Sequence, residues 1–145
     1  MKLYHATYKF LGKEAVLNPR KLSDTHHKGI CLARSPGSAL VASMKRKRYV
    51  YVCDSEAVAL KKSEVWDAQA TGEVYVTSPV KVHLHLNLKS FGTHFYGMID
   101  IAHKFFHEFS VDISVANKKE KEAFFNTYKR SIRMIDEILE DTLYL

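Results

Sequence analysis

The sequence predicts a single α+β domain, in which a mixed β core is followed by a helical C-terminal part. Residues 1–90 contain several short runs of alternating or β-rich residues, separated by Gly, Pro and Ser, with one helix-like segment among them. Residues 91–145 instead carry apolar residues at helical spacing. The 145 residues are enough for one domain with a sizeable core and too few for two of ordinary size.

The first predicted strand covers residues 2–7, with Leu3 and His5 on the same face. A histidine in such a strand needs a hydrogen-bond partner or a ligand. Residues 8–28 lack clear periodicity, so we expect mostly loop, with a helical turn at 13–17 as an option. A loop of that length inside a compact domain is usually functional.

A strand, a helix and a second strand follow. Residues 29–33 (GICLA) form a continuous apolar run, which predicts a strand. Ser35 is a natural helix cap and Pro36 suits the first helical position, so we expect a helix over 36–45 with small residues that allow close packing on a sheet. Residues 48–53 (RYVYVC) alternate and have high β propensity.

The clearest strand signal lies at residues 80–88, where five apolar residues alternate strictly with polar ones. All five are therefore expected on one face. A shorter alternating run at 73–77 precedes it and begins with Glu73, directly after Gly72. Residues 58–60 offer one more short strand.

Two helices are predicted after the β core. Residues 96–109 carry apolar residues at helical spacing. The second helix is signalled by Asn117 with Glu120 three residues later, which is the pattern of a capping box. Both helices need a partner surface, either the sheet or each other. The second helix has a continuous face formed by Phe124, Tyr128, Ile132, Ile135, Leu139 and Thr142.

Composition indicates a globular protein, with 46% hydrophobic and 26% charged residues. No apolar run approaches the length that spans a bilayer, and the amino terminus lacks the apolar core of a signal peptide, so we expect a cytoplasmic protein without membrane contact. We expect Cys31 and Cys53, inside strand-like segments, to be reduced and buried.

The net charge of +6 gives a modest attraction to polyanions. Its one dense basic run consists of Lys45, Arg46, Lys47 and Arg48. This run is either a solvated loop between a helix and a strand or a patch that contacts phosphates, for instance in a nucleic acid.

Two groups of side chains have spacings at which metal ligands could converge, and we expect neither to bind a metal. Asp100, His103 and His107 share one helical face, but the face is polar and no fourth ligand is indicated. His83 and His85 point the same way from one strand, but lysines share that face. The sequence contains no nucleophile elbow, phosphate loop or paired cysteine motif.

Three segments, taken in order, carry a resemblance to a known family. Residues 3–7 (LYHAT) resemble the first strand, "L-Y-H-G-T", of small ADP-ribosyltransferase domains. Residues 29–40 (GICLARSPGSAL) are similar to their second strand and the helix after it. Residues 72–82 resemble the strand that begins with their catalytic glutamate. The chain thus resembles the domains of poly(ADP-ribose) polymerases and rifamycin-modifying enzymes, which implies a split β-sheet core with one intervening helix and NAD as a substrate.

The resemblance implies roles for individual residues. His5 would hydrogen-bond a ribose hydroxyl of NAD, the backbone at Ala6 would hold the nicotinamide carboxamide, and Thr7 would lie beside them. Glu73 would hold the 2′-hydroxyl of the nicotinamide ribose. A carboxylate placed there stabilises the positive charge that develops on the sugar as nicotinamide leaves. A neutral histidine can donate and accept, so His5 suits positioning better than proton transfer.

The chain also departs from the family pattern. Cys31 stands where the family has an aromatic residue that stacks on nicotinamide, and Tyr8, Tyr49 or Tyr51 could take over that role. Thr71 stands where arginine-modifying members have a second Glu or Gln, which makes arginine a less favoured target. The resemblance leaves Cys31, Tyr51 and the helix cap Ser35 as further candidate contacts to NAD.

These observations predict an ADP-ribosyltransferase that moves ADP-ribose from NAD to a macromolecular acceptor, which could be a protein or a nucleic acid. Two alternatives stay open. The first is an inactive domain of the same fold that binds a nucleotide or a protein, favoured by Cys31 in the stacking position. The second is a basic interaction protein that binds nucleic acid through the run at residues 45–48.

Overall fold

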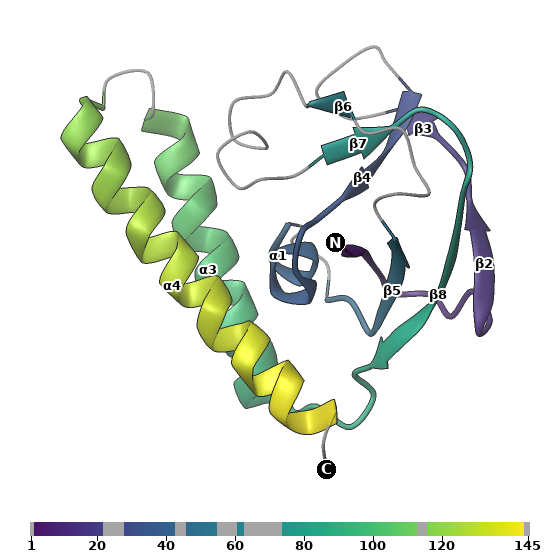
Figure 1. The fold of residues 1–145 in the computed structure, drawn as a ribbon. Coiled ribbons are helices and arrows are strands. Elements are labelled where there is room, and N and C mark those ends of the chain that lie inside the picture. Colours follow the sequence, from purple (N-terminus) through teal and green to yellow (C-terminus); the bar gives the residue numbers. More distant parts are fainter. Residues whose placement is uncertain are drawn as a thin grey trace.

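The computed structural model describes residues 2–21, 28–42, 46–54, 61–62, 74–112 and 116–143. Across these residues the chain forms two four-stranded antiparallel sheets and three helices, which confirms the α+β class (Figure 1). The first sheet has the order β1 (Lys2–Thr7), β5 (Tyr49–Asp54), β8 (Val80–Asn87), β2 (Glu14–Leu17). The second has the order β3 (Arg20–Lys21), β4 (Lys28–Leu32), β7 (Val74–Val76), β6 (Lys61–Lys62).

The two sheets meet where the edge strand β1 comes next to the end of β4. Tyr4 donates its backbone N–H to the carbonyl of Ala33 at 2.8 Å and accepts from the N–H of Ala33 at 2.9 Å. The β core is therefore split into two sheets that are joined at one edge. This junction also places the side chains of β1 beside the start of the following helix.

Two apolar cores lie on opposite faces of the first sheet. One core fills the space between the two sheets and includes Leu3, Leu32 and Tyr51. The other lies between the first sheet and the helices and includes Ala6 and Val50. Successive residues of a strand point to opposite faces, so β1 and β5 contribute to both cores.

Strand β8 changes face along its length, which corrects the prediction that its five alternating apolar residues share one face. The register with β5 shifts at a β-bulge, where Val50 pairs with Leu86 and Tyr51 pairs with Leu84. The extra residue reverses the alternation. Val80 and Val82 therefore belong to the core between the sheets, whereas Leu86 and Leu88 belong to the core under the helices.

The helices form a layer on one side of the first sheet (Figure 1). They are α1 (Pro36–Val41), α3 (Thr93–Asp112) and α4 (Lys118–Leu143). α3 and α4 pack on each other, and α1 contacts both of them as well as β1 and β5. The apolar face predicted for α4 is buried at Phe124, Tyr128, Ile132, Ile135 and Leu139. Among the described residues, no helix is long and apolar enough to cross a membrane.

Both predicted helix caps are present. The hydroxyl oxygen of Ser35 accepts a hydrogen bond from the backbone N–H of Ser38 at 3.1 Å, which caps α1. The side-chain oxygen of Asn117 accepts from the N–H of Glu120 at 2.8 Å at the start of α4. α1 has a second cap from a distant part of the chain, because Asp136 of α4 accepts from the N–H of Gly37 at 2.6 Å.

The segment expected to be mostly loop contains two strands, so the option of a helical turn at residues 13–17 is wrong. Glu14–Leu17 pairs with β8, and Arg20–Lys21 pairs with β4. A four-residue strand has too short a pattern to identify from sequence, and its pairing partner decides its conformation. The predicted strand at residues 58–60 lies outside the described residues, as do residues 43–45 of the predicted first helix.

Candidate functional site

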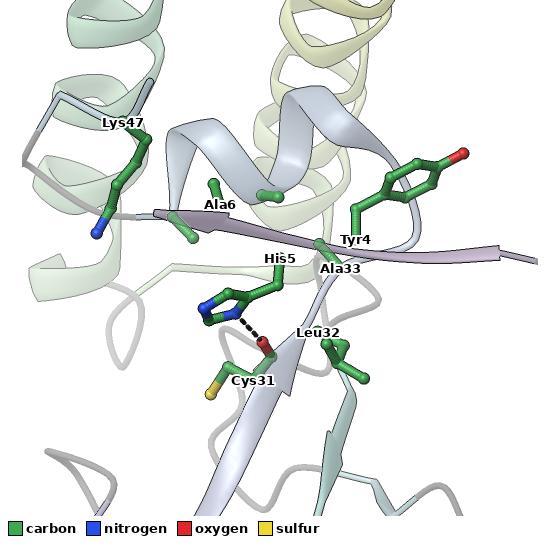
Figure 2. A pocket seen from close by; sticks show the side chains of 9 residues that line it. Tyr4, His5, Ala6, Cys31, Leu32, Ala33 and Lys47 are labelled. Atoms are coloured by element: carbon green, nitrogen blue, oxygen red, sulfur yellow. Dashed lines mark hydrogen bonds between the residues drawn. The ribbon is translucent and has the colours of Figure 1, made fainter. Parts of the chain in front are cut away.

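His5 is fixed on the edge strand by one of its ring nitrogens. Its Nδ1 lies 3.2 Å from the backbone carbonyl oxygen of Cys31 on β4 (Figure 2). A carbonyl oxygen can only accept, so Nδ1 carries the proton and Nε2 is left as an acceptor. The contact joins the two sheets close to the β-bridge between Tyr4 and Ala33, which sets the orientation of the imidazole.

His5 lines a pocket of about 210 Å³ between the edge of β1, the end of β4 and helix α1 (Figure 2). Much of its wall is formed by the small residues Ala33, Ala39 and Ala42. Their side chains leave space that larger ones would fill. The pocket brings together three of the predicted site residues, His5, Ala6 and Cys31. The full lining comprises Tyr4, His5, Ala6, Cys31, Leu32, Ala33, Ala39, Ala42 and Lys47.

Ala6 contributes its backbone to this pocket. In an antiparallel strand, every second residue directs its N–H and C=O to the same side. Tyr4 uses both groups to bond Ala33 at the edge of β1 that faces away from β5. Ala6 lies two residues further along the strand. The N–H and C=O of Ala6 are therefore directed to the pocket side of the strand.

The environment of His5 favours the neutral imidazole. Burial lowers the pKa of His5 below its ordinary value of 6.5, and the positive charges of Lys47 and Arg20 lower it further, although the hydrogen bond to Cys31 acts in the opposite direction. At neutral pH the ring therefore keeps its Nε2 lone pair. This arrangement suits the acceptance of a hydrogen bond from a hydroxyl group.

Glu73, the predicted catalytic acid, lies outside the described residues. The described chain resumes at Val74, the first residue of β7, which is in register with Leu32 of β4. Leu32 is a pocket-lining residue.

The structure does not bring three other predicted contacts to the pocket. The hydroxyl of Thr7 accepts from the N–H of Lys9 at 3.2 Å, and the hydroxyl of Ser35 is used in capping α1. Tyr51 is fully buried between the sheets. Its ring therefore does not take the place of the missing aromatic residue.

The two cysteines differ in exposure, which corrects the expectation that both are buried. Neither forms a disulfide within the described part of the chain, and Cys53 is buried. Cys31 is exposed and lines the pocket. A strand-like apolar segment predicted burial for Cys31, but β4 lies at the junction of the two sheets, where one of its faces opens into the pocket.

Lys47 is the site residue that the family resemblance did not indicate. It belongs to the basic run, and its side chain reaches the pocket (Figure 2). Helix α3 anchors this part of the chain, because the Tyr96 hydroxyl donates to the carbonyl of Lys47 at 2.9 Å. Arg46 lies over the Tyr96 ring and 3.6 Å from Asp100. Lys45 lies outside the described residues.

A second cavity of about 510 Å³ lies beside α3 and contains the histidines that were considered as metal ligands. His103 is not on a solvated face, because its Nδ1 lies 2.7 Å from the carbonyl oxygen of Val41 at the end of α1. Asp100 and His107 are exposed. The described residues contain no group of three or more His, Cys, Asp or Glu that could hold a metal ion.

Comparison of the chain with protein-family models, with curated proteins and with solved structures found no match. The case for a function therefore rests on the pocket and on the motifs that line it.

Proposed function

We propose that this protein is an ADP-ribosyltransferase that moves ADP-ribose from NAD to a macromolecular acceptor. The pocket beside His5 takes the nicotinamide end of NAD. One observation carries the proposal: the imidazole of His5, oriented by the carbonyl of Cys31, and the backbone edge of β1 at Ala6, which has no strand partner among the described residues, share a single pocket. The order of the motifs that place these residues is the order found in the family that the sequence resembles.

The strand edge is complementary to a carboxamide. A primary amide carries N–H donors next to a carbonyl acceptor, and the backbone of Ala6 offers one acceptor and one donor. The apolar side chains of Leu32, Ala33 and Ala39 suit the faces of a flat ring. The pocket is smaller than the roughly 300–1,000 Å³ of sites for drug-sized ligands, which fits one ring, with the remainder of NAD outside.

Electrostatics support the same assignment. The nicotinamide ring of NAD carries a positive charge, so a neutral His5 avoids repulsion that an imidazolium would cause. Burial and neighbouring cations hold the pKa of His5 low enough for this. Lys47 also lines the pocket, and pairing of its ammonium group with a phosphate of the dinucleotide would offset its repulsion of the nicotinamide cation.

The proposed reaction exchanges one bond at the anomeric carbon. The bond between C1′ and the nicotinamide nitrogen breaks, and its electron pair leaves with nicotinamide, which becomes neutral. A lone pair of the acceptor forms the new bond to C1′, and the acceptor's proton passes to solvent. The carboxylate of Glu73 accepts a hydrogen bond from the 2′-hydroxyl and stabilises the cationic sugar in the transition state. His5 holds a ribose hydroxyl in position.

A second candidate is a domain of the same fold that binds NAD without cleaving it. The exposed thiol of Cys31 favours it, because Cys31 lines the pocket where a stacking aromatic would help to hold the ring.

Release of nicotinamide from NAD, measured by chromatography in the presence of a cell extract as acceptor source, tests the proposal. The wild-type protein should release nicotinamide, and Glu73→Gln should lower the rate by about 10²-fold or more. Glu137→Gln, at an exposed position of α4, is the matched control and should behave as wild type. Calorimetry with NAD completes the test: binding without release selects the second candidate, and neither binding nor release contradicts both.

A further inference from the structure

Two aromatic rings stand exposed on the loop between β1 and β2. Tyr8 is 50% exposed and Phe10 is 56% exposed, and they lie two residues apart. Phe10 also contacts the ring of Tyr49, with 5.4 Å between the ring centroids. Large apolar groups gathered on a surface often mark a binding site.

The backbone that presents these rings is held by a buried side chain. The hydroxyl of Tyr51 accepts a hydrogen bond from the N–H of Leu11 at 2.9 Å and donates one to the carbonyl of Gly12 at 2.7 Å. Gly12 has a φ of 95°, a conformation that favours glycine. These bonds hold the backbone at Leu11 and Gly12, next to Phe10, so this part of the loop loses less conformational entropy when a ligand binds.

Positive charges surround the rings. Segments 8–13 and 46–49 contain five Lys or Arg residues and no Asp or Glu. The ammonium groups of Lys9 and Lys47 each lie 5.8 Å from the centroid of the Tyr8 ring. Arg48 is exposed, and its N–H is bonded to the carbonyl of Thr7 at 3.1 Å, which ties the two segments together.

We propose that the surface formed by Tyr8, Lys9, Phe10, Lys47 and Arg48, here termed the aromatic platform, binds single-stranded nucleic acid. Unpaired bases stack on the exposed rings, and the phosphates pair with the lysines and the arginine. A duplex hides its base faces and cannot use the rings. Arg46 is already paired with Asp100, and Glu14 follows Lys13, so we assign Lys9, Lys47 and Arg48 to the ligand. Three cations beside the rings favour a polyanion.

The platform adjoins the pocket through Lys47, which contacts the Tyr8 ring and also lines the pocket beside His5. A strand bound on the platform would therefore reach the pocket. The binding itself does not depend on the proposed transferase activity. The step that makes this strand the acceptor of ADP-ribose does rest on that proposed function.

Fluorescence anisotropy with a labelled single-stranded oligonucleotide of mixed sequence, without NAD, tests the binding. Tyr8→Ala and Phe10→Ala should each weaken affinity by about 5-fold to 150-fold. Met134→Ala, at an exposed apolar residue of α4, is the control and should bind as wild type. Lys47→Ala and Arg48→Ala should each reduce the slope of log affinity against log salt by about 0.7, whereas Lys129→Ala on α4 should leave it unchanged.

Equal affinity of wild type and the Tyr8→Ala Phe10→Ala double variant would overturn the proposal, as would tighter binding of a duplex of the same sequence. Glu73→Gln separates this result from the fate of the transferase, because it should bind the oligonucleotide as wild type does. Nicotinamide release without strand binding rejects the platform and retains the enzyme. Strand binding without nicotinamide release retains the platform and rejects the enzyme.

Discussion

The imidazole of His5 is fixed in orientation and favoured in its neutral form, which suits the positioning role proposed for it better than proton transfer. Its Nδ1–H is engaged by the carbonyl of Cys31, and burial with two neighbouring cations lowers its pKa. A group that stays neutral at neutral pH can accept a hydrogen bond at Nε2. This state is compatible with the proposed role of holding a ribose hydroxyl, which the resemblance implies for His5.

The lowered pKa of His5 predicts a dependence of stability on pH. The unfolded chain binds a proton at this histidine as the pH falls below 6.5, but the folded chain resists protonation until the lower folded pKa is reached. The contribution of His5 to the free energy of unfolding is therefore complete above 6.5 and is lost as the pH falls through the folded pKa. Urea unfolding between about pH 7 and pH 5 should show a steeper loss in wild type than in His5→Gln.

The control for this measurement is His94→Gln, because His94 is exposed at the start of α3. It should retain the wild-type slope. An identical slope in His5→Gln and wild type would show that the imidazole is not held in the neutral form by folding.

The difference in exposure between the cysteines predicts selective labelling. Cys31 is exposed in the pocket, whereas Cys53 is buried, and burial raises the pKa of its thiol. Iodoacetamide should therefore alkylate Cys31 well before Cys53 in the native protein, as followed by peptide mass spectrometry. Saturating NAD should slow the labelling of Cys31. Unchanged labelling at saturating NAD would place the ligand away from this pocket.

Among the elements, the helix caps and the long strands could be predicted because their signals are local. Ser35 and Asn117 form the caps that their sequence positions indicate. Strand β2 could not be predicted in the same way, since four residues carry too little pattern and its partner β8 lies more than 60 residues away in the sequence. The bulge in β8 could not be predicted for a related reason. Strict alternation in the sequence implies that the alternating residues share one face of the strand, unless an extra residue interrupts the pairing with the neighbouring strand.

Helix α1 depends on α4 for its position, which can be tested at a glycine. A Cβ added at Gly37 would lie 2.6 Å from Oδ1 of Asp136 and 3.1 Å from the carbonyl oxygen of Ile132. Gly37→Ala should therefore push α4 away from the end of α1 and lower the free energy of unfolding by about 1–3 kcal/mol, measured by urea denaturation. Such a shift would also disturb the pocket wall that α1 provides through Ala39 and Ala42.

Gly97 in α3 is the matched control for this substitution, because a Cβ added there meets no other atom within 4 Å. Gly97→Ala should raise the free energy of unfolding by about 0.5–1 kcal/mol, as expected when alanine replaces glycine inside a helix. Destabilisation of similar size by both substitutions would contradict the role given to the contact between Gly37 and α4.

At the scale of the whole molecule, the C-terminal helices complete the core under the first sheet. The sequence predicted them as an extension of the β core, but Ile135 and Leu139 of α4 pack in the same core as Ala6 and Val50. α3 also contacts two elements beside the pocket. Tyr96 bonds the carbonyl of Lys47 in the basic run, and His103 bonds the carbonyl of Val41 at the end of α1. The helices therefore support the elements that line the pocket.

A chain that ends at residue 90 should consequently fail to fold. Its first sheet would expose one apolar face, and α1 would lose its cap from Asp136. We expect the shortened chain to lack a cooperative thermal transition by circular dichroism, in contrast to the full chain. A cooperative transition in residues 1–90 would show that the helices are an independent addition.

Part of the pocket lining could be predicted because each segment that resembles the ADP-ribosyltransferase family is continuous in the sequence. The segments that form β1 and β4 indicated His5, Ala6 and Cys31 as site residues, and all three line one pocket in the structure. Lys47 was indicated only as part of a basic run, since nothing in the sequence links it to His5, which lies 42 positions earlier. Tyr51 was proposed as a stacking residue because of its aromatic ring. Its position in the strand buries that ring, and its hydroxyl instead bonds the loop at Gly12.

A crystal structure of Glu73→Gln soaked with NAD would decide whether the pocket at the edge of β1 binds the nicotinamide end of NAD, as we propose. We expect the carboxamide against the backbone of Ala6 and a ribose hydroxyl within hydrogen-bond distance of Nε2 of His5. NAD bound in the cavity beside α3, or no NAD bound at a saturating concentration, would contradict it.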